Sequence, residues 1–227
     1  MGSSHSNQFY TGEIDKKNYQ NAQIKRHGSK ANKKRKEEQE KMNIITIIPA
    51  KGNSNRFPNK NITMFNGKPM FTWAIDACSE SKYPMNVYVS SDSKDILEIA
   101  EWYGAKPIQR KIEVCGDNVY KQAVIRSAAE EIGRYCEVNG IEYPDIAISL
   151  QPNSPQIKGY HLDLAIDTLI KENKDEIFSV DSNLMQNAAF RVMKWDYVFQ
   201  KDLSTNCGVV VCDLKDIHTK EDMEKLI

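Results

Sequence analysis

Three basic side chains, Lys51, Arg56 and Lys60, fall within ten residues of one another, directly after a short apolar run. The segment "KGNSNRFPNK" also contains asparagines and Ser54, which favour turns and can leave backbone amide groups facing an anion. Gly52 lets the backbone approach a ligand closely. Backbone N–H groups combined with mobile cations suit a triphosphate. The segment therefore predicts a phosphate-binding loop, with a basic surface loop as the alternative, and it matches neither GxxxxGK[ST] nor GxGxxG.

Further polar side chains follow later apolar runs. Asp92 follows "NVYVSS", where it could orient a substrate hydroxyl or cap the next helix, and "IQRKIEVCGD" places Arg110 and Asp117 after another run. In "LQPNSP", Gln151 and Ser154 flank proline positions that stiffen the backbone. A stiff segment with neutral donors and acceptors suits the recognition of a sugar or a base.

A carboxylate, Asp216, follows the last apolar run, "CGVVVCD". At a nucleotide site such a group can hold Mg²⁺ that bridges phosphate oxygens. Thr219 is expected to cap a final helix, with Glu221 and Asp222 in its first turn.

The segments that must position these side chains alternate between strand and helix patterns. Short β-branched or apolar runs predict strands over residues 43–50, 86–92, 105–110, 145–152, 176–181 and 207–213. Helical apolar spacing predicts helices over residues 68–81, 93–105, 118–136, 157–173 and 219–227. This alternation predicts an α/β fold with a mainly parallel sheet. Ligands bind outside the carboxyl ends of such strands, which is where the polar side chains fall.

The bulk composition excludes some classes of function. The 31 basic and 31 acidic residues balance, so net charge gives no reason to expect nucleic-acid binding by the domain. No apolar run approaches the roughly 18 residues of a membrane helix, and the first residues lack a secretory signal. Five cysteines without CxxC spacing predict reduced thiols. We therefore expect a cytoplasmic protein that does not contact a membrane.

Residues 1–41 differ from the rest of the chain. They carry ten basic and five acidic residues and almost no apolar clusters. So polar a segment buries too little surface to offset the entropy of ordering, which predicts a disordered extension. The extension could contact a nucleic acid, an anionic surface or a partner, or it could simply be solvated. Residues 42–227 are expected to form the folded domain.

Six sequence blocks in order resemble the acylneuraminate-type cytidylyltransferases, which activate sialic, pseudaminic and legionaminic acids as CMP sugars. The blocks are "IIPAKGNSNRFPNKNI", "GKPM", "VYVSSD", "IAEWYGA", "LQPNSP" and "DIHTKED". They span residues 42–227, and the first and fifth are the most specific. The resemblance implies a Rossmann-like three-layer sandwich of the nucleotide-diphospho-sugar transferase type.

The resemblance also implies an activity. The anomeric hydroxyl of a nonulosonic acid would attack the α-phosphate of CTP, with Mg²⁺ as cofactor and pyrophosphate as leaving group. The side chains implied to act on the phosphates are Lys51, Arg56 and Lys60. Those implied to bind the nucleotide are Gly52, Ser54, Asn61, Arg110, Asp117 and Gln151. Those implied to bind the sugar are Asp92, Ser154 and Arg191, and the metal position is Asp216.

This chain departs from the resembled pattern at several positions. His218 stands where the family has a second aspartate, and Tyr120 and Lys121 replace small serines. Arg191, in "QNAAFRVMK", would meet a substrate carboxylate or be an ordinary surface arginine. The family forms homodimers, but the segment that builds the interface is shortened between Val180 and Cys207.

Three functions therefore stay open at the level of the sequence. The first is a CMP-sugar synthetase that uses CTP and a small acidic sugar. The second is a nucleotidyltransferase for a different phosphate or acid acceptor. The third is a catalytically impaired domain that binds a nucleotide or a sugar, which His218 favours because imidazole is a poor ligand for Mg²⁺.

Overall fold

The central strand of the domain, β1 (Ile44–Pro49), is buried on both of its faces. Its odd and even positions enter two different hydrophobic clusters: Ile44 and Ile48 pack into one, and Ile45 and Ile47 into the other. Burial on both faces explains why the strand reads as a continuous apolar run. The structure, a computed structural model, describes residues 41–54, 56–116, 118–202 and 204–226. The predicted extension lies outside the described residues except for Lys41, as does Asp117.

Seven strands form the main sheet, in the order β5-β4-β1-β6-β8-β7-β9. Besides β1 they are β4 (Asn86–Ser91), β5 (Lys106–Gln109), β6 (Ile146–Leu150), β7 (Glu176–Val180), β8 (Gln186–Lys194) and β9 (Cys207–Val211). Strands β5, β4, β1 and β6 pair in parallel, as do β7 and β9. The six predicted strands are all present, and the predicted α/β fold with a mainly parallel sheet is confirmed.

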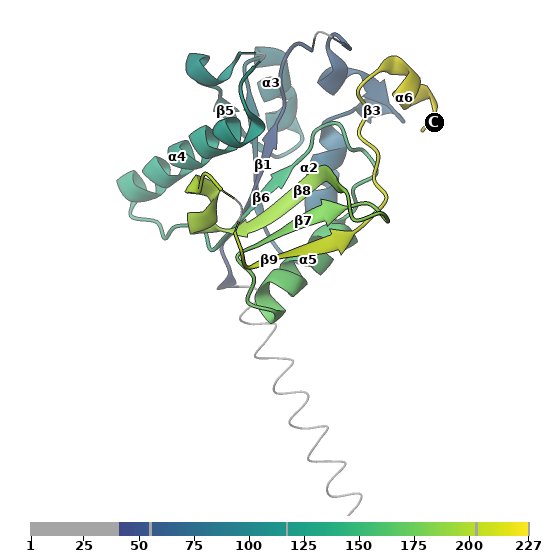
Figure 1. Ribbon diagram of the computed structural model, residues 1–227. Helices are drawn as coiled ribbons and strands as arrows, with labels where there is room; N and C mark the ends of the chain where they lie inside the picture. The colour runs from purple at the N-terminus through teal and green to yellow at the C-terminus, as the bar shows by residue number, and fades with distance from the viewer. Residues whose placement is uncertain (1–40, 55, 117, 203, 227) are drawn as a thin grey trace, which may run out of the picture. The chain divides into compact units, whose positions relative to one another are not determined.

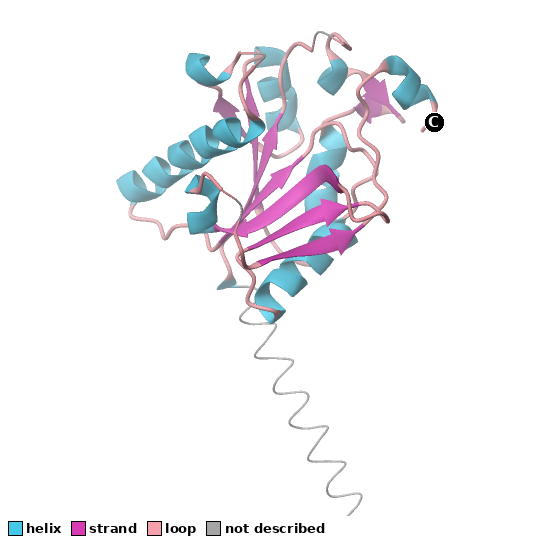
Figure 2. Cartoon of the chain, in the orientation of Figure 1, coloured by secondary structure: helices cyan, strands magenta, loops and turns pink. Residues whose placement is uncertain are grey.

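Helices cover both faces of this sheet and complete three layers (Figure 1). One hydrophobic cluster packs the sheet against α2 (Thr72–Ser79), α3 (Lys94–Trp102) and α5 (Gly159–Lys171). The other packs it against α4 (Lys121–Asn139) and the 3-10 helix η3 (Trp195–Phe199). Figure 2 shows the same arrangement, with the sheet between its helices.

The remaining elements lie around the strand ends. They are the 3-10 helices η1 (Lys60–Ile62) and η2 (Ile112–Val114), the hairpin β2 (Met64–Phe65) and β3 (Lys68–Pro69), and the short helix α6 (Lys220–Glu224). A third, smaller cluster of Phe65, Met70 and Ile217 joins the hairpin to the segment before α6. This contact fixes the hairpin, which follows the loop after β1, to the segment that contains Asp216.

Strand β8 is the one strand of the main sheet that sequence patterning missed, and the short hairpin of β2 and β3 was not predicted either. Strand β8 lies between β6 and β7 and is antiparallel to both. Consecutive residues, Ala189 with Phe190 and Val192 with Met193, are buried, so the strand lacks the alternation that marks a half-buried strand. Its register with β7 also shifts between Phe178 and Val180, which interrupts the pattern further.

The predicted helix caps are present. The Ser93 side chain accepts a hydrogen bond from the Ile96 amide at the start of α3, and Gly104 follows the helix with φ of 82°. Thr219 and Asp222 form a capping box at α6. None of the described helices is long and apolar enough to cross a membrane.

Candidate active site

Two adjoining hollows lie at the carboxyl ends of β1 and β6. The larger, of about 350 Å³, is lined by Pro49, Lys51, Asn53, Ser54, Arg56, Lys60, Asn61, Gln151, Pro152 and Asn153. The smaller, of about 160 Å³, is lined by Pro49, Lys51, Arg110, Val114, Gly116, Val119, Lys121, Val124 and Gln151. Pro49, Lys51 and Gln151 belong to both linings, so the hollows form one strand-end cleft. This is the edge at which an α/β sheet binds ligands.

The loop after β1 is held against the start of α3. The Gly52 amide donates to Asp92 Oδ1 at 2.7 Å. A Cβ atom on Gly52 would lie 2.7 Å from Ser93 Cβ, which is closer than real side chains come. Glycine is therefore required here by the close approach of the two segments, as well as being suited to approach by a ligand.

Asp92 is hydrogen-bonded to the loop after β1. Its carboxylate accepts from Gly52, and the residue that caps α3 is its neighbour Ser93. The expectation that Asp92 caps the helix is thus corrected, and its role toward a substrate hydroxyl stays a prediction. Its carboxylate fixes the phosphate-binding loop because that loop's backbone amide comes within hydrogen-bonding distance.

Asn61 is buried beside the loop with half of its amide group unused. Its Nδ2 donates to the Lys51 carbonyl at 2.8 Å, which fixes the loop to η1. Its Oδ1 is buried and has no partner among the described residues. A buried acceptor without a partner is costly, so this atom is available to a ligand donor or an ordered water.

Arg110 forms the floor of the smaller hollow. It is only 7% exposed, and its Nη2 donates to the Ser90 carbonyl at 3.0 Å. Its Nε is a second buried atom without a partner among the described residues. Burial lowers the pKa of Arg110, and the nearby Asp92 carboxylate opposes that shift. An unpaired buried guanidinium nitrogen is well suited to hydrogen-bond an acceptor on a ligand.

Lys60 is the first residue of η1, and its surroundings shift its pKa in opposite directions. Burial lowers the pKa of its ammonium group, and Arg56 acts in the same direction. The carboxylates of Asp216 and Asp222 act in the opposite direction. The Asp216 carboxylate is therefore near enough to act on Lys60, although it lies more than 150 residues later in the chain.

A second wall of the cleft is formed where "LQPNSP" meets the segment after β9. Ser154 Oγ donates to Asp216 Oδ1, and Asn153 Nδ2 donates to the Ile217 carbonyl at 3.0 Å. The Ile217 amide returns a hydrogen bond to the Asn153 carbonyl at 2.8 Å. Burial raises the pKa of Asp216, while Ser154, His218, Lys121 and Lys60 all act to lower it.

The side chains around Asp216 suit a metal ion that takes most of its ligands from phosphates and water. No group of three or more His, Cys, Asp or Glu side chains that could hold a metal occurs within the described ranges. Mg²⁺ often uses one or two protein carboxylates and takes its other ligands from phosphates and water. The half-buried Asp216 carboxylate fits a Mg²⁺ ion that arrives with a nucleotide, and His218 adds no hard oxygen ligand.

Arg191 does not lie free at the surface or open to the cleft. Its Nε donates to Glu176 Oε2 at 2.7 Å, its Nη2 contacts the same oxygen, and its Nη1 donates to Gln122 Oε1 at 3.0 Å. Glu176 is fully buried in β7. The interpretation of Arg191 as an ordinary surface arginine is corrected, because a buried carboxylate that needs a counter-charge pairs with its guanidinium group.

Lys121 lines the cleft, although its sequence context showed it only as a departure from a resembled pattern. Its Nζ donates to the Ala188 carbonyl at 3.5 Å. Burial lowers its pKa, Asp216 opposes that shift, and Arg191 adds to it. The one signal in the sequence was a lysine at the first turn of a helix that follows the "CGD" loop.

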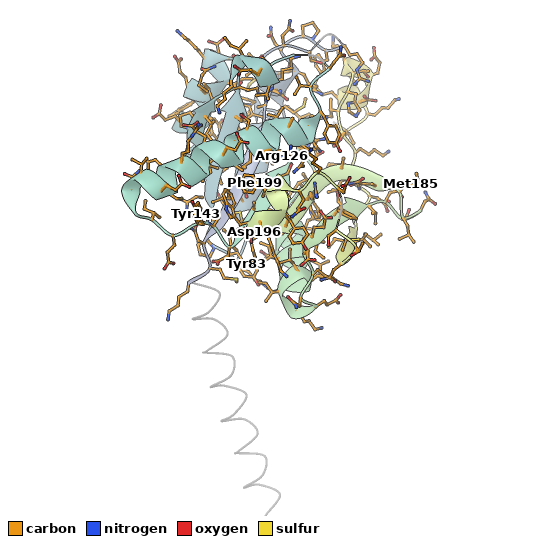
Figure 3. All side chains as sticks on the ribbon, turned by 60° about the vertical axis from the view of Figure 1, so that its left-hand side comes forward. Tyr83, Arg126, Tyr143, Met185, Asp196 and Phe199 are labelled. Carbon is orange, nitrogen blue, oxygen red and sulfur yellow. The ribbon has the colours of Figure 1, made fainter. Side chains whose placement is uncertain are left out.

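A larger hollow lies elsewhere in the described part of the molecule. It has a volume of about 840 Å³ and is lined by residues of α4, η3 and the segment between α4 and β6. Tyr143, Asp196 and Phe199, all labelled in Figure 3, belong to this lining. Its walls carry basic and acidic side chains together, and it lies at the amino-terminal end of β6, away from the carboxyl ends of the parallel strands. The strand-end cleft is therefore the candidate site despite its smaller volume.

Comparison with known proteins decides the family. A sequence profile described as cytidylyltransferase matches residues 45–206. The chain belongs to this cytidylyltransferase family. The match begins within β1 and covers both walls of the cleft except the Asp216 segment.

Relatives with known names agree with the family. N-acylneuraminate cytidylyltransferase A of Danio rerio is 32% identical over 154 residues, which are 68% of this chain and 33% of the relative. Pseudaminic acid cytidylyltransferase of Campylobacter jejuni is 40% identical over 90 residues, 39% of each protein. The chain thus spans about a third of the length of the first curated relatives it matches.

Solved structures support the fold. The chain is similar to CMP:2-keto-3-deoxy-manno-octonic acid synthetase complexed with CTP, with a TM-score of 0.65 and 13% identity, over 81% of this chain and 96% of that one. A cytidylyltransferase from Leptospira borgpetersenii gives a TM-score of 0.57 and 16% identity, over 82% and 85%. At these identities the likeness concerns the fold alone.

Proposed function

We propose that residues 42–227 form a CTP-dependent nucleotidyltransferase domain that joins CMP to the anomeric hydroxyl of a nonulosonic acid. In this reaction a bond forms between the acceptor oxygen and the α-phosphorus of CTP. The bond from that phosphorus to the bridging oxygen of the β-phosphate breaks, pyrophosphate leaves with the electron pair, and the hydroxyl proton is released. Such a transfer depends mainly on positioning and on neutralising charge.

The observation that carries this proposal is the charge of the cleft. Among the described residues, five basic residues and no acidic residue line its two hollows: Lys51, Arg56, Lys60, Arg110 and Lys121. The whole chain is formally neutral, so this concentration of one sign is local. A cleft lined by one sign of charge raises the local concentration of an oppositely charged substrate. A triphosphate is an anion of the required charge and length.

Two buried polar atoms of the cleft that lack a partner in the described part of the chain support the binding of a nucleoside attached to these phosphates. Asn61 Oδ1 is a buried acceptor without a partner, and Arg110 Nε is a buried donor without one, among the described residues. The cytosine ring and its ribose carry both donors and acceptors, so they could satisfy the two atoms together. Val114, Val119 and Val124 give the smaller hollow apolar walls for a flat ring.

Ser154 and Asp216, on the second wall of the cleft, would bind the nonulosonic acid that accepts CMP. Ser154 and Asp216 are hydrogen-bonded to each other within reach of the Lys60 and Lys121 charges. Mg²⁺ held by Asp216 and phosphate oxygens would supply neutralisation of the phosphate charge. Asn153 keeps the wall in place through its two hydrogen bonds with Ile217.

The test is pyrophosphate release by the full chain with Mg²⁺, each of the four nucleoside triphosphates, and a panel of acceptors. The panel holds N-acetylneuraminic, pseudaminic and diacetyllegionaminic acids, with phosphorylated and neutral sugars as controls. We expect release with CTP and one of the three acids, and its loss on chelation of the metal. A response only to a different acid or to a phosphate would instead establish the second function left open by the sequence.

His218 is the observation that favours an impaired site, and one variant separates that function from the main proposal. His218→Asp supplies the carboxylate that the resembled pattern carries at this position. We expect the natural chain to be active and the variant to differ only modestly. Activity that occurs in His218→Asp and not in the natural chain would mean that the natural domain binds nucleotide without transferring it.

A further inference from the structure

Lys121 enters the strand-end cleft from a different wall than the other lysines. It is the first residue of α4, whereas Lys51 and Lys60 belong to the loop that follows β1 and to η1. Its ammonium group donates to the Ala188 carbonyl of β8 at 3.5 Å. Together with Arg110 and Gln151 it lines the smaller hollow. The cation thus faces the cleft from the side of α4 and β8.

The neighbouring residue fixes the position of this lysine. Gln122 is buried, its Nε2 donates to the Val198 carbonyl at 3.0 Å, and its Oε1 accepts from Arg191 Nη1 at 3.0 Å. These bonds join the first turn of α4 to η3 and β8. The backbone at Lys121 is therefore held in place, and the bond from its Nζ to the Ala188 carbonyl directs the side chain.

Lys121 lines the smaller hollow of the cleft, where an anion on a ligand can reach its ammonium group. Asp216 attracts the ammonium group and Arg191 repels it, and burial disfavours its charged form. A partly buried charge gains stability from an opposite charge that becomes hydrogen-bonded to it. Arg191 is no competitor for that anion, because its guanidinium group contacts Glu176 and Gln122.

The chemistry of the acceptor identifies the anion. In a nonulosonic acid the carboxylate is bonded to the anomeric carbon that carries the attacking hydroxyl. A hydroxyl placed beside Ser154 and Asp216 brings that carboxylate close to the same point of the cleft. Lys121 and Lys60 are the two lysines whose charges reach Asp216. Lys60 stands on the phosphate side, next to Arg56.

We infer that the Lys121 ammonium group binds the carboxylate of the nonulosonic acid acceptor and selects free acids over uncharged sugars. This inference rests on the proposed function and names a residue that the resembled pattern does not supply, since a small serine stands at this place in the family. The Lys121 charge orients the acid so that its adjacent hydroxyl faces the α-phosphate.

The test compares Lys121→Met and Lys121→Arg with the natural chain, and uses Lys106→Met as a matched control. Lys106 lies on β5 and its Nζ donates to Asn86. The substrates are N-acetylneuraminic, pseudaminic and diacetyllegionaminic acids and their methyl esters. In Lys121→Met we expect the KM for the reactive acid to rise on the order of tenfold or more, because hydrogen bonds to charged groups contribute about that much. The KM for CTP should rise much less, because the other four basic residues of the cleft remain.

The esters supply a readout that loss of structure would not give. The natural chain should prefer the free acid to its ester, Lys121→Met should treat the two alike, and Lys121→Arg should retain part of the preference. Binding of the acids to the CMP-loaded chain, measured by calorimetry, gives the same comparison without turnover. Thermal unfolding checks that each variant folds, and Lys121→Gln replaces Lys121→Met if the latter does not.

The outcomes separate this inference from the proposed function. Turnover of an acid with CTP that does not depend on Lys121 overturns the inference and leaves the function standing. A rise in the KM for CTP instead of the acid also overturns it, because Lys121 would then be a phosphate ligand. Acid binding that depends on Lys121, without turnover, supports the inference and contradicts the function. No binding of any acid by the natural chain overturns both.

Discussion

At the residue scale, Lys60 combines burial with the fields of two carboxylates. Burial lowers its pKa, and Asp216 and Asp222 oppose the shift. A triphosphate in the cleft would give this ammonium group a strong partner that the ligand-free protein lacks. Its charge is therefore needed chiefly when substrate is bound.

Lys60→Ala should consequently reduce kcat/KM for CTP without unfolding the protein. We expect a loss on the order of 100-fold, the size found when one preorganised charge-stabilising group is removed. Steady-state pyrophosphate release and thermal unfolding measure the two effects. Lys94→Ala, at an exposed position at the start of α3, is the control and should leave both unchanged. Near-normal use of CTP by Lys60→Ala would remove Lys60 from the catalytic machinery.

The sequence could place most of the candidate site but could not assign every charged residue. Runs ending in "PAKG" and "LQPNSP" predicted correctly that Lys51, Lys60 and Gln151 lie together, because strand ends of a parallel sheet share an edge. The contacts of Asp92 and Arg191 were not predicted. Asp92 accepts a hydrogen bond from Gly52, and Arg191 donates one to Glu176. Such partners depend on the register of the sheet, which the sequence pattern leaves undetermined.

At the element scale, α5 begins in direct contact with the end of α2. A Cβ atom on Gly159 would lie 2.4 Å from the carbonyl carbon of Glu80 and 2.6 Å from the Ser81 amide nitrogen. These are backbone atoms, so neither can move aside by changing a rotamer. The two helices can approach only because residue 159 has no side chain.

Gly159→Ala should therefore destabilise the domain by about 1–3 kcal/mol, the usual cost of overpacking. Gly133→Ala, inside α4, is the matched control, because its Cβ would meet Tyr143 and Trp195 at 3.6 and 3.7 Å, ordinary contact distances. That change should stabilise the helix by roughly 0.5–1 kcal/mol. Urea unfolding measures both variants, and equal effects of the two would contradict the packing described for α5.

Asp175 connects the amino-terminal end of β7 to its neighbours. Its carboxylate accepts from Lys194 Nζ at 2.8 Å and from Ser204 Oγ at 3.0 Å. The bond from Lys194 is the main cause that lowers the pKa of Asp175 from 3.8 to about 2 in the folded protein. The folded state thus binds this proton less readily than the unfolded state.

The contribution of Asp175 to stability should be complete above pH 4 and should disappear as the pH falls toward 2. Asp175→Asn should therefore melt at a lower temperature than the natural chain at pH 7. The difference should shrink between pH 4 and pH 2, because the natural carboxyl group becomes neutral over that range. Melting curves across this range measure it, and a difference independent of pH would mean that the ionised carboxylate does not stabilise the fold.

The strands and helices show what patterning can predict and where it fails. The strand over residues 43–50 was predicted because β1 is buried on both faces as a continuous β-branched run. Strand β8 was missed because its buried residues come in adjacent pairs and its pairing with β7 is irregular. An antiparallel strand inserted between two parallel ones also breaks the regular alternation of strand and helix.

At the scale of the whole molecule, the hydrophobic clusters of the described chain all lie within one compact unit, Met42–Ile227. The cleft is lined from the same unit. The fold class was predictable because it depends on alternation and patterning, which are local properties of the sequence. Which side chains meet across the cleft depends on three-dimensional approach and required the structure.

A chain that begins at Met42 should therefore fold and react like the full chain. Its melting midpoint should be unchanged, and its turnover of CTP should agree within about twofold, the range usual for changes that touch no buried contact. Calorimetry and pyrophosphate release measure the two properties on both chains. A large loss of either one would show that residues 1–41 contribute to the fold or to the site.

The most direct measurement follows the α-phosphorus of CTP. The full chain is incubated with Mg²⁺, a nonulosonic acid, and CTP labelled either at the α- or at the γ-phosphorus. We expect the α label to appear in a CMP-acid product and the γ label in pyrophosphate, at equal rates and only when the acid is present. Release of the α label as free CMP, or its retention in CTP with each of the three acids, would contradict the account.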